Sequence, residues 1–272
     1  MPTATAHIRA REASPLGPRG RMANVRARGP WRRLPAPTDL AQHYDAAADR
    51  WHVQMQLLGY PRAYAALFGL LRAEGWLSHL DRTTPVLDCG VGTAVLGAAV
   101  AHAVPAVRWI AAVDISIGML TRAAASLRAA GVAADLRHAD ARRLPFPDAT
   151  FDLVVSAHML EHLDEPEAAL REMARVLRPG APLVIVAARG GLANGMIRLK
   201  WRHVPLSRWD LARRIELSGF RHVRTAPIGA LLRPAYWLSR VHLAVKRGDG
   251  LAWVGEASAN SVVNQKRKGG AS

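Results

Sequence analysis

Two carboxylates stand at the ends of apolar runs in this sequence, and their surroundings could bind a ligand. Asp88 precedes the glycine turn Gly90-Val91-Gly92, and Asp114 ends the next apolar run 26 residues later. Glycines let the main chain approach a ligand closely, and a helix N-terminus after the turn adds free N–H groups. A carboxylate at a strand end can accept hydrogen bonds from two ribose hydroxyls. The spacing predicts a site for a ribose-bearing ligand; the alternative is that Asp114 only caps the helix beginning near Ile117.

The charge at the turn separates two classes of ligand. In a dinucleotide site the turn faces a pyrophosphate, which Asp88 would repel. The third glycine of the dinucleotide fingerprint is also absent, because Val95 stands in its place. The turn therefore favours a cationic ligand over NAD.

A second pattern, His158-Met159-Leu160-Glu161-His162, resembles the H-x-x-E-H arrangement of certain zinc proteases. No third ligand follows it, so we predict no metal site. His158 lies two residues beyond an apolar run that ends at Ser156. There it could orient a substrate or take a proton as a general base, and the alternative is a ring bonded to backbone at a helix start. The lone cysteine, Cys89, has no sequence partner for nucleophilic chemistry and is predicted to pack or to contact a cofactor.

The elements that would position these residues alternate along the chain. Strands are predicted at 85–89, 109–114, 151–156 and 182–188, with a weaker one at 134–138, and helices at 93–104, 117–130 and 166–177. Strands that are apolar on both faces indicate a parallel sheet covered by helices. Helices at 38–51 and 61–74 precede the sheet, and helix-like residues up to about 218 and strands at 221–226 and 241–247 follow it. We therefore expect an α/β, Rossmann-like, mostly parallel sheet with helices on both faces, an antiparallel final strand and N-terminal cap helices.

The net charge of +16 over 272 residues is unevenly distributed. Residues 1–37 carry eight arginines and one acid, 38–186 carry 13 basic and 16 acidic residues, and 187–254 carry 13 basic and 3 acidic residues. We predict a disordered basic tail at 1–37, one domain at 38–250 and a loose tail at 251–272. A charge excess outside the predicted binding half makes nucleic acid a disfavoured partner.

Residues 190–240 mix aromatic residues with many arginines. This basic-aromatic composition, with Trp201, Trp209, Tyr236 and Trp237, suits an anionic or membrane-resident substrate and peripheral membrane contact. The alternative is an ordinary solvated helix face with tryptophans in the core. One cysteine and the lack of a secretory-type segment lead us to expect a cytoplasmic protein. The sequence makes no prediction of oligomeric state.

Four stretches resemble the class I S-adenosylmethionine-dependent methyltransferases, in particular the broad group that includes the ubiquinone/menaquinone C-methyltransferases. They are VLDCGVGTA, AAVDIS, HADARRLPFPDATFDLVVSAHMLEHL and ALREMARVLRPGAPLVIV, which run in the family's order from Val86 to Val186. The stretch from Tyr44 to Trp51 is more weakly similar to the family's opening segment. Ala94 departs from the pattern, because many members have glycine there.

The resemblance implies S-adenosyl-L-methionine as the cofactor and assigns its parts to positions in this chain. The methionine part would lie among Asp88, Gly90, Gly92 and Ser156, the ribose on Asp114, and the adenine among Ile115, Met119, Asp140 and Ala141, with Tyr44 closing over the cofactor. A sulfonium beside Asp88 agrees with the cationic ligand expected from the residues alone.

The implied reaction is direct in-line transfer of a methyl group to a small-molecule or lipid-like acceptor. The resemblance also implies that residues 190–240 select the acceptor, because family members differ most there. The sulfonium is already a good leaving group, so positioning and exclusion of water can supply much of the catalysis. A non-catalytic S-adenosylmethionine-binding regulator is one alternative. A nucleic-acid methyltransferase is disfavoured, because the fourth strand is followed by Ser156-Ala157-His158-Met159 and not by an Asn-Pro-Pro-Tyr type motif.

Overall fold

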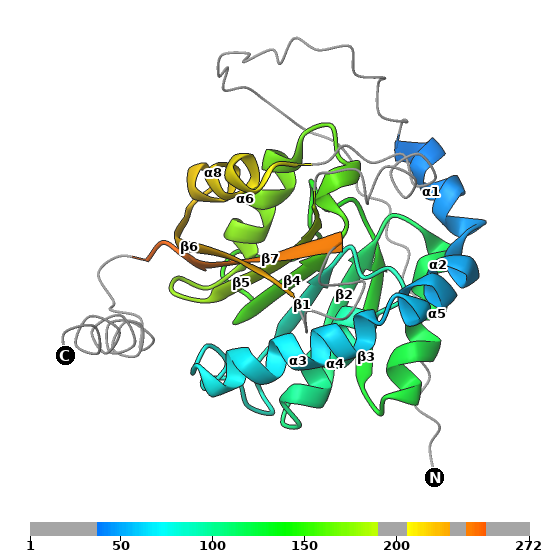
Figure 1. Cartoon of the computed structure of the whole chain (residues 1–272), viewed down its shortest axis with the longest axis horizontal. Coiled ribbons are helices and arrows are strands. Elements are labelled where there is room, and N and C mark those ends of the chain that lie inside the picture. Colours follow the sequence, from blue (N-terminus) through cyan, green and yellow to red (C-terminus); the bar gives the residue numbers. More distant parts are fainter. Residues whose placement is uncertain (1–36, 190–205, 229–237, 249–272) are drawn as a thin grey trace, which may run out of the picture.

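The computed structural model describes residues 37–189, 206–228 and 238–248 (Figure 1). The predicted tails at 1–37 and 251–272 lie outside this part, except for Pro37, and so do Trp201, Tyr236 and Trp237. Within the described ranges, no helix is long and apolar enough to cross a bilayer.

A seven-stranded sheet in the order β3-β2-β1-β4-β5-β7-β6 forms the centre of the molecule (Figure 1). Its strands are β1 (Val86–Cys89), β2 (Trp109–Asp114), β3 (Ala133–His138), β4 (Leu153–Ala157), β5 (Pro182–Ala188), β6 (Phe220–Pro227) and β7 (Ser239–Lys246). The first five are parallel, and β7 is antiparallel to both β5 and β6. The expected α/β class and antiparallel final strand are confirmed. The last strand in the chain is interior to the sheet, and β6 forms its edge.

Helices cover both faces of the sheet because successive strand residues point to opposite sides. Val86, Ile110 and Leu153 enter one hydrophobic core. Their successors Leu87, Ala111 and Val154 enter the other. The first core is covered by α3 (Tyr60–Ala73), α4 (Val95–Ala103) and α5 (Ile117–Ala129), and the second by α6 (Pro166–Val176) and α8 (Arg208–Leu217). Both sheet faces are therefore apolar and closed.

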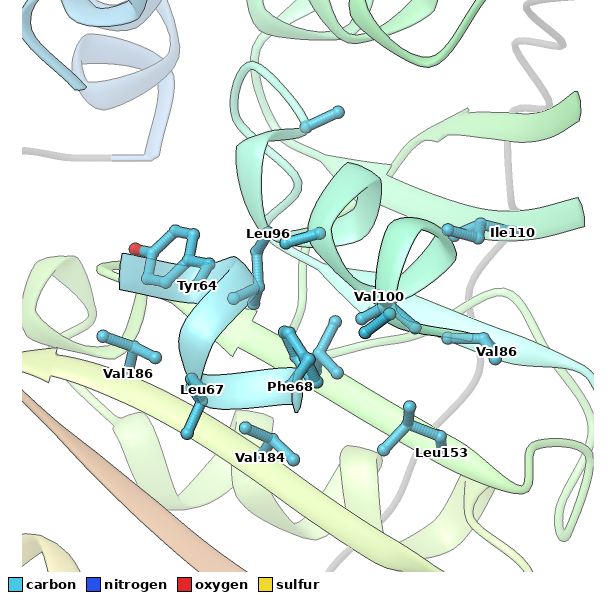
Figure 2. Close-up of a cluster of buried hydrophobic side chains, with 14 of the residues drawn as sticks. Tyr64, Leu67, Phe68, Val86, Leu96, Val100, Ile110, Leu153, Val184 and Val186 are labelled. Atoms are coloured by element: carbon cyan, nitrogen blue, oxygen red, sulfur yellow. The ribbon is translucent and has the colours of Figure 1, made fainter. Parts of the chain in front are cut away.

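Helix α3 supplies the largest fully buried side chains of the first core, Tyr64 and Phe68 (Figure 2). Leu67 of the same helix lies near Val184 and Val186 of β5. Burying a side chain of this size contributes about 1.5–3 kcal/mol relative to leaving it exposed. The predicted helix at 61–74 is thus part of the core as well as a cap.

The predicted cap helix at 38–51 is wrong in one respect, because it is two helices. α1 (Pro37–Asp45) and α2 (Ala48–Leu57) are separated by Ala46 and Ala47. At the break, Asp45 Oδ1 accepts hydrogen bonds from Ser116 Oγ at 2.6 Å and from the Gly118 N–H at 2.8 Å. This contact fixes the end of α1 to the first turn of α5. An alanine pair carries no local signal for such a break.

Candidate active site

A cavity lies at the carboxyl ends of β1, β2 and β4, between the sheet and the cap helices. Its volume is about 100 Å³ when measured as space for the centre of a water molecule, and about 890 Å³ when all space between the atoms, open solvent included, is counted. The first value is below the roughly 300–1,000 Å³ of common ligand pockets. Ten of the eleven predicted site residues line this cavity: Tyr44, Asp88, Gly90, Gly92, Asp114, Ile115, Met119, Asp140, Ala141 and His158.

The turn after β1 brings the main chain to the cavity. Gly90 and Gly92 have φ values of 73° and 50°, in the left-handed region that favours glycine. The N–H groups of Gly90 and Val91 both donate to the Val113 carbonyl at 2.9 Å, which ties the turn to β2. Ala94 also has a positive φ, of 62°, just before α4. An alanine in this conformation carries strain that a glycine would not.

Asp88 is 1% exposed and lines the cavity. Its Oδ2 accepts a hydrogen bond from the Gly97 N–H at 3.0 Å. Burial raises the pKa of this carboxyl to about 7, although the Gly97 hydrogen bond lowers it. Among the described residues it has no ion-pair partner.

Asp114 holds the turn from the neighbouring strand. Its Oδ2 accepts from the Gly92 N–H at 2.8 Å, and its Oδ1 accepts from the Ser116 N–H at 3.0 Å. Burial raises its pKa too. Ser116 is the N-cap of α5, with its Oγ accepting from the Met119 N–H, so Asp114 does not fill that role. The Ile115 N–H also bonds this carboxylate, which leaves part of its acceptor capacity for ligand hydroxyls.

An apolar wall with one polar side chain continues the cavity beyond Asp114. Ile115, Met119 and Ala141 supply the wall, and Asp140 supplies the polar group. Asp140 is paired with the Arg142 guanidinium at 2.6 Å. Burial of Asp140 opposes ionisation, but the Arg142 hydrogen bonds and charge outweigh it and lower the pKa.

Aromatic side chains from the cap helices cover the cavity. Tyr44 is buried, and its hydroxyl lies 2.9 Å from His162 Nε2. Trp51 meets Tyr44 edge to face, with ring centroids 6.0 Å apart. Sequence reasoning missed Trp51, Met55 and Tyr64 as lining residues, because each lies on a helix whose pattern indicates only an amphipathic face.

Ser156 and Cys89 are buried in strands and do not line the cavity. Ala157, the next residue on β4, takes the lining position expected of Ser156. Cys89 packs in the core under α6, and burial raises the pKa of its thiol well above the usual range. That environment opposes formation of a nucleophilic thiolate.

His158 lines the end of the cavity beside β4, and its ring lies against side chains. Its Nδ1 is 3.5 Å from Glu161 Oε1, and its Nε2 is 3.4 Å from Ser239 Oγ. In the described part of the chain, no three His, Cys, Asp or Glu side chains are grouped as metal ligands would be. The two histidines of the H-x-x-E-H pattern have different partners. His158 lies near Glu161 and Ser239, whereas His162 Nε2 lies 2.9 Å from the Tyr44 hydroxyl.

Comparison with known proteins identifies the family of the central part of the chain, residues 87–185. A family model described as a methyltransferase domain matches residues 87–185. A demethylmenaquinone methyltransferase of Mycolicibacterium vanbaalenii is 36% identical over 153 residues, covering 55% of this chain and 60% of the relative. Residues 87–185 are a class I S-adenosylmethionine-dependent methyltransferase domain. The resemblance drawn from the four sequence stretches is thereby confirmed.

The names of the curated relatives state different methyl acceptors. A phosphatidylethanolamine N-methyltransferase of Cereibacter sphaeroides is 41% identical over 103 residues, covering 37% of this chain and 49% of the relative. The chain thus spans about half to three fifths of the length of these curated relatives. The matched domain begins in β1 and ends in β5, so the cap helices and the last two strands lie outside it.

Solved structures agree with the methyltransferase fold. Magnesium protoporphyrin IX methyltransferase from Synechocystis PCC 6803, with bound SAH, superposes with a TM-score of 0.61 at 20% identity, covering 78% of this chain and 100% of that one. A Haemonchus contortus phosphoethanolamine N-methyltransferase gives 0.57 at 16% identity, covering 78% and 59%. At such identities the likeness concerns the fold alone.

Proposed function

We propose that this chain transfers a methyl group from S-adenosylmethionine to a small-molecule or lipid-like acceptor. One observation carries the proposal: Asp88 is buried and Asp114 is partly buried, neither has a cationic side-chain partner in the described structure, and both line one cavity. Two such groups cost much free energy unless a bound cation or hydrogen-bond donors compensate them. The cofactor's sulfonium and ammonium would supply the charge, and its ribose hydroxyls the donors.

The residues present fit this cofactor at each of its parts. Asp88 and the glycine turn would hold the methionine part, Asp114 the ribose, and Ile115 and Met119 the adenine. Asp140 and Ala141 would stand at the adenine edge, and Tyr44 would close over the whole from α1. When bound, the cofactor supplies the activated methyl group. The chain's own part is then to orient both reactants and exclude water.

A binding experiment tests the cofactor assignment. Calorimetry of the full chain should show S-adenosylmethionine binding and weaker or no NAD binding. Asp114→Ala should weaken S-adenosylmethionine binding roughly tenfold or more, because two charge-assisted hydrogen bonds to the ribose are lost. Asp135→Ala is the matched control, since Asp135 lies on the neighbouring strand β3 and does not line the cavity. Unchanged affinity in Asp114→Ala would remove the ribose assignment, and tighter NAD binding would remove the cofactor assignment.

The competing function is that of a non-catalytic cofactor-binding regulator. Such a protein needs the carboxylate site but no space for an acceptor. Here the cavity continues from Asp88 to His158, Met159 and Leu163 at the end of β4, which supports a place for the acceptor. Incubation with methyl-labelled cofactor and a lipid and metabolite extract tests this: label in an extract component supports transfer, and none supports the regulator.

A second proposal concerns the acceptor's surroundings. The names of the relatives include a quinone and a phospholipid acceptor, and Trp209 on α8 is 72% exposed with the Arg208 guanidinium 4.3 Å from its ring centroid. We propose peripheral membrane contact through residues 190–240. Sedimentation with phosphatidylglycerol vesicles should exceed that with phosphatidylcholine vesicles and decline with salt, and Trp209→Ser should weaken it. Binding that ignores both lipid charge and salt would contradict the proposal.

A further inference from the structure

A buried polar chain adjoins the acceptor end of the cavity and joins four separate parts of the fold. The Tyr60 hydroxyl of α3 lies 2.6 Å from Ser239 Oγ of β7, which lies 3.4 Å from His158 Nε2. His158 Nδ1 lies 3.5 Å from Glu161 Oε1. The Ala188 N–H at the end of β5 donates to the same Glu161 oxygen at 2.6 Å. The two ring nitrogens of His158 thus face different groups.

Glu161 is an unusual residue to find in this position. It is 2% exposed, and its Oε2 has no hydrogen-bond partner in the described structure. Burial opposes its ionisation, but the His158 hydrogen bond, the His158 and His162 charges and the Ala188 N–H outweigh burial and lower its pKa to about 2. A buried carboxylate that is incompletely bonded is costly as a structural element alone.

The backbone at His158 is strained in the same place. His158 has a φ of 54°, a conformation uncommon for residues other than glycine. Its N–H donates to the Val186 carbonyl at 2.8 Å, which holds the residue there at the end of β4. Strain of this kind persists where the surrounding structure over-determines it, and it concentrates at functional sites. Here it brings an imidazole to the cavity wall.

We propose that Glu161 positions His158 with a proton on Nδ1, leaving Nε2 to take a proton from the methyl acceptor. Glu161 does not line the cavity and so acts only through His158. The inference rests on the proposed function and narrows its substrate class to acceptors whose attacking oxygen or nitrogen carries a proton. The distances of 3.5 and 3.4 Å lie at the long end of the hydrogen-bond range.

The proton and electron balance of the step is complete. The acceptor's O–H or N–H atom forms a bond to the methyl carbon while the carbon–sulfur bond breaks. Sulfur keeps the electron pair of that bond and becomes neutral. The acceptor's proton moves to His158 Nε2, giving an imidazolium whose positive charge faces the Glu161 carboxylate. The product is the methylated acceptor, and no further reactant is needed.

The first arm of the test does not depend on activity. In the full chain labelled with ¹⁵N-histidine, NMR should show the neutral His158 ring protonated on Nδ1, assigned by loss of the signal in His158→Asn. Asparagine tolerates positive φ, so that variant should fold. Glu161→Gln keeps an oxygen acceptor and should keep the tautomer, whereas Glu161→Ala should lose it. A ring protonated on Nε2 in the wild-type chain would overturn the proposal.

The second arm measures transfer of labelled methyl groups to a lipid and metabolite extract. Glu161→Gln should lower kcat about tenfold or more, and His158→Asn more still, while cofactor Kd stays within about twofold. Glu167→Gln, which removes a partly exposed carboxylate of α6 paired with Arg214 of α8, should match the wild type. Wild-type kcat in Glu161→Gln or His158→Asn would overturn the inference while leaving the proposed function intact. A wild-type chain that transfers no label would overturn both.

Discussion

The proposed cofactor assignment makes the protonation of a single side chain, Asp88, depend on the charge of the bound ligand. Its pKa of about 7 follows from burial, so near neutral pH about half the molecules carry a proton there. A bound sulfonium favours the ionised carboxylate. Binding of S-adenosylmethionine near pH 6.5 should therefore release part of a proton.

Calorimetry in buffers of different ionisation enthalpy measures this release. The observed binding enthalpy should vary with the buffer for S-adenosylmethionine. S-adenosylhomocysteine is the matched control ligand, because it lacks the sulfonium charge and should release less. Equal buffer dependence for the two ligands would show that Asp88 does not sense the sulfonium.

Some residues at the cavity could be predicted from the sequence and others could not. Asp88 and Asp114 were predictable because each follows a run of strand residues and faces the same sheet edge. The sequence assigned Glu161 no role. Its hydrogen bond from the Ala188 N–H, 27 residues away on β5, forms only in the folded chain. Trp51 and Tyr64 gave no signal, since an aromatic residue on a helix face is ordinarily part of a core.

At the scale of elements, the contact between α1 and α5 sets the position of the cap. A Cβ added at Gly118 would lie 2.9 Å from both Cα and the carbonyl oxygen of Asp45, so the backbone of α1 would have to move. Gly118→Ala should displace Tyr44, the neighbour of Asp45, and weaken cofactor binding about three- to tenfold.

Affinity and proteolysis of α1 in Gly118→Ala measure the effect. Gly69→Ala is the matched control, because Gly69 is also helical and nothing lies within 4 Å of an added Cβ. That control should be neutral or slightly stabilising, as alanine is the better helix former. If Gly118→Ala binds cofactor as the wild type does, α1 does not set the cavity's cover.

Helices and strands were predictable where the local sequence pattern alone determines their ends. The sequence predictions for β2 at 109–114 and β5 at 182–188 match the structure residue for residue, because continuous apolar runs with sharp polar ends define both. The single helix predicted at 38–51 failed because its break depends on Asp45 meeting Ser116 and Gly118, which no local pattern reveals.

Two buried groups, Asp88 and His242, have opposite effects on how the stability of the whole molecule changes with pH. Asp88 has a raised pKa, from 3.8 to about 7, so it destabilises the fold as pH rises from about 4 to 7. His242 has a pKa lowered by burial from 6.5 to about 4, so it destabilises the fold as pH falls from about 6.5 to 4. Each effect is on the order of 3–4 kcal/mol at most, and they nearly cancel.

Single substitutions should separate the contributions of Asp88 and His242 to the change of unfolding free energy with pH. Asp88→Asn should lose more stability than the wild type between pH 7 and pH 4, and His242→Gln should lose less or gain. Urea unfolding at several pH values measures both, with Thr225→Val as a control that removes the hydrogen-bond partner of His242 but no titrating group. Parallel curves for all variants would contradict this account.

The placement of β7 between β5 and β6 has a consequence for synthesis on the ribosome. While the chain emerges, β5 presents an unpaired edge until Ser239–Lys246 has been made. That edge carries the apolar run of β5, which can pair with other chains. In a nascent chain, the cavity-facing ends of β1, β2 and β4 are therefore complete while the sheet is still open to aggregation. Chaperone access is then most important just before β7 is released.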